Sequence, residues 1–278
     1  QHLWIGPWSH LPWSRRVGLL DFGAAADSPV DRLQLQWFDH FLKGQSTDLI
    51  PAAPVHLFEM GSNHWQAFNH WPSITPQPLY LGSTGLAATH QQDGQLTPTP
   101  PARQGQDTWV HDPWRPVPSL GGHSAIPAGY FERSALDGRS DVVTYTTCPL
   151  VTPLRVVGTI HLSLYCQVDA ISFDLSVILS EVYPDGRVIN LTQGYQKVDG
   201  AGQTEPLLHL LDLHPTCFLI PAHHRLRLSL AAACFPAYPV NSGTGQPLAM
   251  TETIDHQVIT LELWHGGDYP SSLELPCR

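Results

Sequence analysis

A histidine near the start of the chain has the sequence context of a catalytic base. Residues 4–10 read Trp-Ile-Gly-Pro-Trp-Ser-His, so a short apolar strand runs into a Gly-Pro turn and then into His10. An imidazole in such a loop can take the proton from a serine hydroxyl and return one to the leaving group. With no partner in view, a histidine in an aromatic loop is more often structural than catalytic, so the pattern alone leaves both roles open.

The nucleophile and the acid that this chemistry needs do not follow His10 in a usable form. No G-x-S-x-G motif occurs, and the nearest stretch, residues 122–126, reads Gly-His-Ser-Ala-Ile and lacks the second glycine. In α/β-hydrolases the triad runs Ser, then Asp or Glu, then His along the chain. This order excludes Ser124, Asp21 and Asp27. Because the chain does not begin with Met, we expect both partners upstream of it, and we expect the fragment alone to be inactive.

The segments after His10 predict one helix and a second strand. Residues 28–43 combine Ser28 as an N-cap, Pro29 at the first helical position and apolar residues at helical spacing. Gly44 suits the residue after the helix. Residues 55–60 predict a strand. The first part of the chain is therefore expected to fold as strand, helix and strand.

A proline-rich joint at residues 71–78 separates this part from the remainder. We predict a domain boundary there, with residues 1–74 as one unit and residues 75–278 as a β-sandwich. Short apolar or alternating segments follow the joint with almost no helical periodicity, which favours a mainly β fold and permits a jelly roll. Residues 91–107 are polar and rich in Pro and Thr, and we expect an exposed loop. The expected strands cover residues 79–81, 142–146, 154–167, 173–182, 187–191, 225–233 and 257–264.

Composition excludes several classes of function. A net charge of −10 with 14% charged residues argues against binding to nucleic acid, which needs clustered Lys and Arg. The longest apolar run, residues 228–235, is too short to cross a bilayer. The five cysteines and sixteen histidines lack the spacing of disulfide frameworks or metal sites. We expect no cofactor, no metal and a cytoplasmic location, and we regard the Asn190-Leu191-Thr192 sequon as accidental.

Aromatic side chains beside His10 could form a substrate pocket. Trp8 and Trp13 are the candidates for the wall of an apolar acyl site, and Tyr165 is the candidate on the facing edge of the sandwich. The alternative is that these aromatic residues serve only to pack the first unit.

An ordered series of motifs resembles the cocaine esterase / X-prolyl dipeptidyl-peptidase (CocE/NonD) family of hydrolases. One departure is His223, because the family usually has glycine there and a positive φ would strain histidine. The matching segments are GPWSH at residues 6–10, WFDHFLKG at 37–44, DPWRPVPSLGG at 112–122, VYPDGR at 182–187, FPAY at 235–238 and YPSSLELP at 269–276.

The resemblance implies an α/β-hydrolase domain with a helical cap, followed by a galactose-binding-like jelly roll. Residues 1–74 would be the C-terminal remnant of the hydrolase domain and residues 75–278 the jelly roll. His10 would belong to a Ser-His-Asp triad that cleaves acyl esters, amides or X-Pro peptides. The expected partners are such a substrate, the N-terminal hydrolase and cap regions, and a second copy in a homo-oligomer. The alternative is a non-catalytic jelly-roll module that binds carbohydrate or peptide, which would not need the loop at residues 6–10.

Overall fold

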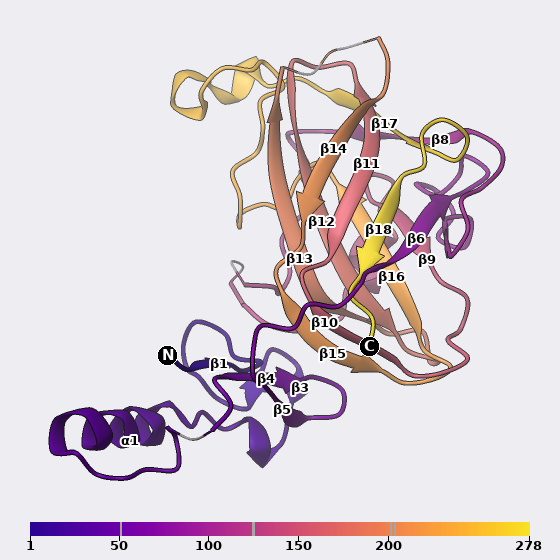
Figure 1. Cartoon of the computed structure of the whole chain (residues 1–278). Coiled ribbons are helices and arrows are strands. Elements are labelled where there is room, and N and C mark those ends of the chain that lie inside the picture. The colour runs from indigo at the N-terminus through magenta and orange to yellow at the C-terminus, as the bar shows by residue number, and fades with distance from the viewer. Residues whose placement is uncertain (51, 124–125, 201, 203) are drawn as a thin grey trace.

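The computed structural model describes residues 1–278 except 51, 124–125, 201 and 203, so Ser124 lies outside the described residues. The described chain is mainly β and is consistent with a β-sandwich preceded by a smaller block (Figure 1). We call residues 1–74 the N-terminal block. It contains β1 (Leu3–Ile5), β2 (Arg16–Val17), β3 (Leu20–Asp21), a 3₁₀ turn (Ala24–Ala26), α1 (Val30–Lys43), β4 (Val55–Glu59) and β5 (His64–Phe68).

The N-terminal block is built on a parallel strand pair. β1 lies parallel to β4, with Leu3 opposite Val55, and β5 adds to β4 in the antiparallel direction. The connection from β1 to β4 includes α1, which is the way that parallel strands are joined in α/β folds. The predicted order of strand, helix and strand is therefore found, while β5 was not predicted.

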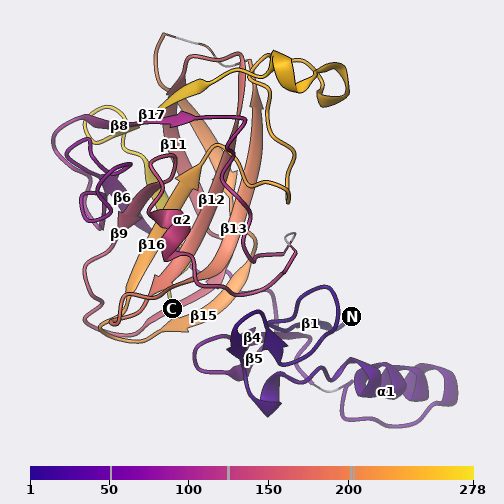
Figure 2. The same cartoon turned by 180° about the vertical axis from the view of Figure 1, so that it is seen from behind.

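One large sheet forms most of the remaining chain. Its strands follow the order β13-β12-β16-β9-β7-β6-β18-β11-β17-β8, and β14 pairs with β11. The path folds back, so that β12, β13 and β16 lie in one layer and β11, β14 and β18 in the other (Figures 1 and 2). These strands are β6 (Gln77–Gly82), β7 (Gln95–Thr97), β8 (Gly105–His111), β9 (Val143–Thr146), β11 (His161–Val168), β12 (Ser172–Val182), β13 (Val188–Asp199), β14 (Leu207–Asp212), β16 (Arg225–Ala231), β17 (Ile259–His265) and β18 (Ser272–Leu275).

The core lies between these two layers. Alternate side chains of facing strands are fully buried, as expected where one face of each strand packs inward. The residues include Leu162, Leu164, Phe173, Leu175, Val177, Leu226, Leu228, Leu230, Leu261, Leu263 and Leu273. A separate two-stranded sheet, β10 (Leu154–Gly158) with β15 (Thr216–Ile220), closes the end of the sandwich that faces the N-terminal block (Figure 1). Short helical segments occur at α2 (Ser134–Asp137), Leu248–Met250 and Thr253–Asp255.

The prediction of a loop at residues 91–107 was wrong in part. β7 and the start of β8 lie inside this range, and both contribute to the large sheet. Leu96 is buried as the one apolar residue of β7. Asp107 is also buried, because it accepts hydrogen bonds from Ser83, Tyr145 and the backbone of Ala87. The polar composition of residues 91–107 predicted that they are exposed. Asp107 can be buried because hydrogen bonds from distant segments satisfy its carboxylate.

The other strand predictions were found at nearly the expected positions, although the segment at 154–167 is two strands, β10 and β11, that separate at Gly158. Strands β14, β15 and β18 were missed. The hairpin at residues 184–186 is present, since the backbone N–H of Gly186 donates to Tyr183. His223 has a φ of 70°, which is the strained conformation that its replacement of glycine suggested.

Helix α1 begins one residue later than the sequence suggested. Pro29 occupies the N-cap position, and Ser28 accepts only a 3.4 Å hydrogen bond from the Val30 N–H. Gly44 ends the helix in the left-handed conformation, as predicted, and its N–H donates to His40. None of the described helices is both long and apolar enough to cross a membrane.

Two backbone seams join the N-terminal block to the sandwich. At the first, the N–H of Met60 donates to Cys217, and the N–H of Leu219 donates to Met60, so the end of β4 continues alongside β15. Beside this seam the fully buried Glu59 carboxylate pairs with Arg155, whose Nε lies 2.5 Å from Oε2. A buried carboxylate without this partner would be strongly unfavourable.

At the second seam, Gly18 lies against Tyr130. The N–H of Leu19 donates to the Tyr130 carbonyl at 2.8 Å, and the two backbones form a parallel bridge. A Cβ on Gly18 would come within 2.3 Å of that carbonyl oxygen, so only glycine fits the approach. The two seams fix the N-terminal block against the end of the sandwich at two separated points.

Gly61 offers a direct test of the first seam. Its φ of +90° is matched by the +92° of Gly186, but a Cβ on Gly61 would lie 2.0 Å from the Leu219 carbonyl oxygen, whereas Gly186 has open space. Gly186→Ala should lower the free energy of unfolding by about 1–2 kcal/mol through backbone strain alone. Gly61→Ala should lower it by roughly 1–3 kcal/mol more, because the seam must open. Urea denaturation of the two variants checks this, and equal losses would show that the seam does not constrain the fold.

The apolar face of α1 should promote association of the isolated chain. No residue of the helix is buried, and Phe38, Phe41 and Leu42 are 54%, 56% and 76% exposed. Phe38→Glu combined with Leu42→Lys should reduce binding of a hydrophobic dye and light scattering, because contiguous apolar patches favour association. Val151→Lys, at a single side chain that is 90% exposed, is the matched control and should change neither signal. The same scattering from all three proteins would contradict this interpretation.

Candidate active-site cavity beside His10

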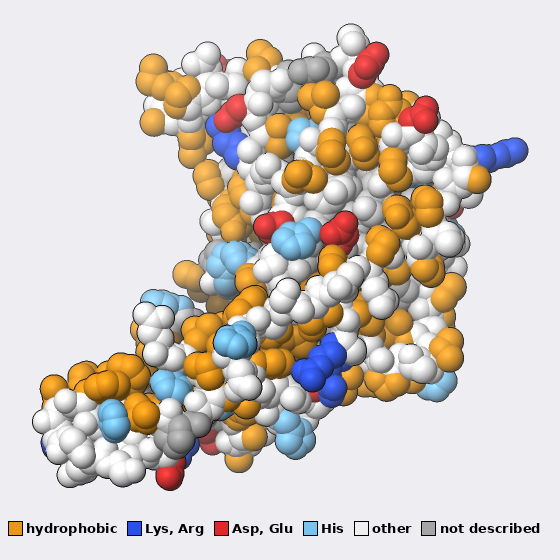
Figure 3. Space-filling view, in the orientation of Figure 1, with side chains coloured by type: hydrophobic (Ala, Val, Ile, Leu, Met, Phe, Trp, Pro, Cys, Tyr) orange, Lys and Arg blue, Asp and Glu red, His pale blue; other side chains and the backbone are white. Residues whose placement is uncertain are grey.

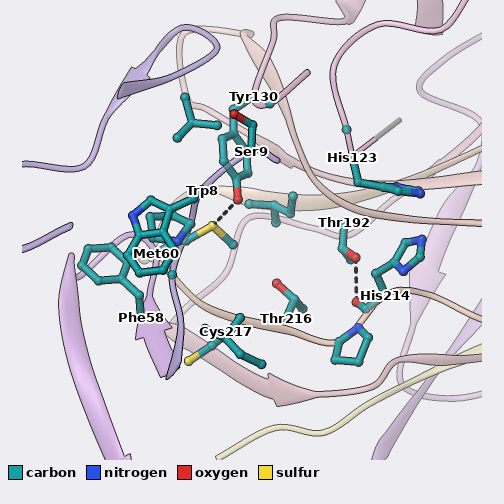
Figure 4. Close-up of a pocket in the computed structure, with 18 of the residues that line it drawn as sticks. Trp8, Ser9, Phe58, Met60, His123, Tyr130, Thr192, His214, Thr216 and Cys217 are labelled. Carbon is teal, nitrogen blue, oxygen red and sulfur yellow. Dashed lines mark hydrogen bonds between the residues drawn. The ribbon is translucent and has the colours of Figure 1, made fainter. Parts of the chain in front are cut away.

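A cavity of about 420 Å³ lies between the N-terminal block and the sandwich (Figure 4). The loop at residues 6–10 forms one side, the end of β4 and β15 forms the floor, and β13 with the segments 122–123, 129–130 and 214–215 forms the other side. The cavity therefore exists because the two seams hold these elements together. The residues that line it include Trp8, Ser9, His10, Phe58, Met60, Trp71, His123, Tyr130, Thr192, Gln193, His214, Thr216 and Cys217.

The loop that carries His10 is fixed by its aromatic residue. The indole Nε1 of Trp8 donates to the Ala26 carbonyl at 2.6 Å, and the ring packs near Trp65. Gly6 permits this fold of the loop, since a Cβ would lie 2.4 Å from the Trp8 ring. His10 follows on the rim of the cavity with an exposed side chain. The Gly-Pro turn thus places the histidine where a bound molecule could reach it.

The walls of the cavity near Trp8 are apolar and closely packed. Figure 4 shows Trp8, Phe58 and Met60 grouped on one side, with the Tyr130 hydroxyl donating to the Met60 sulfur at 2.7 Å. Desolvation of the hydroxyl by the surrounding chain raises the pKa of Tyr130 well above its usual value. Burial, followed by the nearby Glu59, raises the pKa of Cys217 to about 12. Both groups are therefore uncharged at neutral pH, and this side of the cavity suits an apolar ligand.

No described residue that lines the cavity is Asp, Glu, Lys or Arg. Its polar groups on the sandwich side are neutral, among them Thr192, Gln193 and Thr216. Apart from the buried Tyr130 and Cys217, the titratable lining groups are histidines. Protonation of histidine thus decides whether the cavity carries charge near neutral pH.

Asn190 holds the segment at residues 129–131 beside this cavity. Its side chain accepts from the Phe131 N–H at 2.7 Å and donates to the Gly129 carbonyl at 2.9 Å. With the side chain buried and both ends bonded, Asn190 serves a structural purpose in this fold. The sequence indicated Asn190 and Thr192 only as a sequon, because Asn190 contacts residues 59 and 61 positions away and Thr192 contacts His214, 22 positions away.

Two of the predicted substrate-binding residues lie outside the cavity. Trp13 is 47% exposed and does not line it. Tyr165 lies on β11 opposite Trp264 and packs against Tyr269. The structure therefore brings Trp8 together with His10 but leaves these two apart from them, and a binding role for either stays an untested prediction. Met60, Tyr130 and His214 were missed, since only the tertiary fold brings them to the loop.

A second group of Ser, His and Asp is buried in the sandwich but lacks the geometry of a triad. Ser83 Oγ lies 2.9 Å from His265 Nε2 and donates to Asp107 at 2.6 Å. The Asp107 carboxylate approaches the same Nε2 at 3.4 Å. In a triad the acid holds Nδ1 while the serine meets Nε2, so that a proton can pass along a line. Here all three groups converge on one point, and the arrangement ties β8 to β17.

Metal ligation has no support in the described part of the chain, where no cluster of three or more His, Cys, Asp or Glu residues is arranged to hold an ion. All five cysteines are free thiols, and three of them, Cys166, Cys217 and Cys234, are buried. Burial raises the pKa of these thiols, which keeps them protonated and unreactive.

Comparison with known proteins finds sequence similarity to proteins named as esterases and to a peptidase domain. Residues 51–274 match the X-Pro dipeptidyl-peptidase C-terminal non-catalytic domain. Cocaine esterase of Rhodococcus sp. (strain MB1 Bresler) is 30% identical over 98% of this chain and 50% of its own length. A putative serine esterase of Mycobacterium bovis is 31% identical over 84% of this chain and 40% of its own length. The chain thus spans about half the length of these relatives, or less.

Solved structures share the fold. An aminopeptidase from a marine sediment archaeon, Thaumarchaeota archaeon, matches all of this chain and 49% of its own chain with a TM-score of 0.86 at 22% identity. An alpha-amino acid ester hydrolase matches 87% of this chain and 44% of its own with a TM-score of 0.76 at 24% identity. The domain match and the 30% identity to cocaine esterase show that this chain belongs to the CocE/NonD hydrolase family and corresponds to its C-terminal portion.

Proposed function

We propose that this chain is the C-terminal portion of a serine hydrolase that cleaves acyl esters, and that His10 is the histidine of its Ser-His-Asp triad. The observation that carries the proposal is the cavity of about 420 Å³ with His10 on its rim, between the N-terminal block and the sandwich. The esterase names of the relatives support the same class of reaction. Amides and X-Pro peptides are the alternative substrates for the same triad.

The proposal assigns the N-terminal block to an α/β-hydrolase domain. The parallel pair β1–β4 with α1 in the connection supports this assignment, as does the delivery of His10 by a loop directly after a strand. The serine and the acid would come from the hydrolase region outside this chain, and a cap region would complete the site. On this reading residues 75–278 form a jelly roll whose end supplies one wall of the substrate cavity.

The mechanism uses His10 as a proton carrier. The neutral imidazole takes the proton from the serine hydroxyl while the oxygen attacks the ester carbonyl, and the imidazolium then gives a proton to the departing alcohol. In the second half of the reaction, water gives a proton to His10 and attacks the acyl-serine ester. The acid product leaves, and His10 returns the proton to the serine oxygen. The apolar side of the cavity near Trp8 and Phe58 would receive the hydrocarbon part of the ester and exclude water from it.

Replacement of His10 tests the proposed function. In the complete protein that contains these 278 residues, His10→Gln should lower kcat for a simple acyl ester by about 10⁶-fold, the scale found for loss of the triad histidine in subtilisin. His90→Gln replaces another exposed histidine, which does not line the cavity, and should leave kcat unchanged. Thermal unfolding of both variants shows whether they fold. A loss of less than tenfold in a folded His10→Gln enzyme would exclude the triad role and favour the binding-module alternative.

A further inference from the structure

Two histidines form the side of the cavity that lies away from Trp8 and Phe58 (Figure 4). His123 follows Gly122 in the loop over the cavity, and His214 lies in the turn between β14 and β15. Their ring centroids are 4.1 Å apart and the rings meet at 63°, edge to face. The space-filling view shows that histidine side chains are exposed at the junction of the block and the sandwich (Figure 3). The sequence places these residues ninety-one positions apart, so only the fold pairs them.

Strand β13 contacts the segments that carry both histidines. The N–H of His214 donates to the Gln193 carbonyl at 2.9 Å, and its carbonyl accepts from the Thr192 hydroxyl at 2.7 Å. On the other loop, Gly122 has a φ of +75°, and a Cβ there would lie 1.7 Å from Gln193 Oε1. The residue before His123 therefore packs against the side chain of Gln193 on the same strand. Two neighbouring residues of β13, Thr192 and Gln193, thus bring the two histidine segments together.

The ring nitrogens of the pair are available to a ligand. Among the described residues, His214 makes no ring hydrogen bond, and His123 Nε2 has only the Tyr238 hydroxyl at 3.5 Å. No described lining residue carries a permanent charge that could neutralise or repel a bound ion. The other titratable groups that face the cavity are His10 on the first loop, Tyr130 beyond Gly129, and Cys217 on β15.

We propose that His123 and His214 form a subsite for a carboxylate, so that the substrates of this hydrolase include esters that bear a free carboxylate at the end remote from the scissile bond. The inference rests on the proposed function, because it takes the cavity beside His10 as the place where the ester binds. The hydrocarbon part of such an ester would contact the side of the cavity formed by Trp8 and Phe58, with the anion held opposite.

The chemistry of the pair favours an anion over a cation. A protonated imidazole donates a charge-assisted hydrogen bond to a carboxylate, and two adjacent imidazoles can both approach one carboxylate group. An ammonium group would find no acidic partner among the described lining residues. A metal ion would need further ligands, and no described cluster of three or more ligand residues provides them.

The subsite should gain affinity as the pH falls. Partial desolvation by the surrounding chain, and then repulsion by His214, lowers the pKa of His123, so that the ring is neutral at pH 7 in the free protein. A bound carboxylate stabilises the protonated ring and therefore raises its pKa in the complex. Binding then takes up a proton, which becomes unfavourable as the pH rises. An ordinary carboxylate stays ionised down to about pH 5, so the ligand itself does not lose its charge in this range.

Ligand binding by the 278-residue chain tests the subsite with two probes of nearly equal size. Monomethyl glutarate carries one carboxylate, and dimethyl glutarate is its neutral analogue. Calorimetric titration at pH 5.5 and pH 8.0 should show that only the monoanion binds, with an affinity about tenfold or more higher at pH 5.5. In the complex, the ring-proton NMR signals of His123 should titrate at higher pH than in the free chain.

Single substitutions complete the test. His123→Gln and His214→Gln keep a neutral hydrogen-bond donor but cannot carry charge, and each should weaken binding of the monoanion about tenfold, as loss of one charge-assisted bond predicts. His90→Gln is the matched control and should bind like the parent chain. Because His123 and His214 both have exposed side chains, these variants should fold, which thermal unfolding verifies.

Three results would overturn the proposal: equal affinity for the two esters, affinity that does not change with pH, or unchanged binding in both histidine variants. The outcome is separable from that of the proposed function. An inactive His10→Gln enzyme with no preference for the monoanion would leave the esterase assignment standing and remove the subsite. Selective binding of the monoanion together with an active His10→Gln enzyme would keep the subsite and remove the triad role of His10.

Discussion

The cavity depends on the docking of the N-terminal block against the end of the sandwich. Met60 exchanges backbone hydrogen bonds with β15, and the buried Glu59 carboxylate is held by Arg155 from β10. Neither unit contains the cavity alone, since the loop with His10 comes from one and Tyr130 from the other. The ion pair makes separation costly, because it would leave a carboxylate inside the interface without its partner. The shape of the cavity is thus determined by the interface between the N-terminal block and the sandwich.

The N-terminal block and the sandwich fit together because their backbones approach each other closely at glycine residues. Gly18 and Gly61 lie where a Cβ would meet the carbonyl oxygens of Tyr130 and Leu219 at 2.3 and 2.0 Å. Gly122, on the opposite rim of the cavity, instead leaves room for the side chain of Gln193 on β13. Gly18 and Gly61 thus allow direct backbone contact with the other element at two points beside the cavity. The shape of the site therefore rests on a few backbone contacts as much as on the side chains that line it.

The sequence was informative where the determinants are local. The Gly-Pro turn before His10, the left-handed residue after α1 and the strain at His223 all depend on a few neighbouring residues, and each was found as expected. Burial of Asp107 and the pairing of His123 with His214 were not predictable, because hydrogen bonds and contacts between distant segments determine them. The two glycines at 121–122 were visible as a motif, but nothing local indicates that β13 lies beneath them. Sequence thus located the proposed catalytic loop and missed most of the opposite wall.

Because no described lining residue of the cavity carries a permanent charge, two opposite requirements fall on its histidines. A general base at His10 must be neutral to accept the serine proton, so its contribution is lost as the pH falls. An anion subsite at His123 and His214 must be protonated, so its contribution is lost as the pH rises. Turnover of neutral esters would depend only on the neutral form of His10. Turnover of carboxylate-bearing esters would depend in addition on the protonated forms of His123 and His214. The two proposals together therefore imply a rate that rises with pH for neutral esters and passes through a maximum for anionic ones, with the sandwich rather than the catalytic loop responsible for the difference.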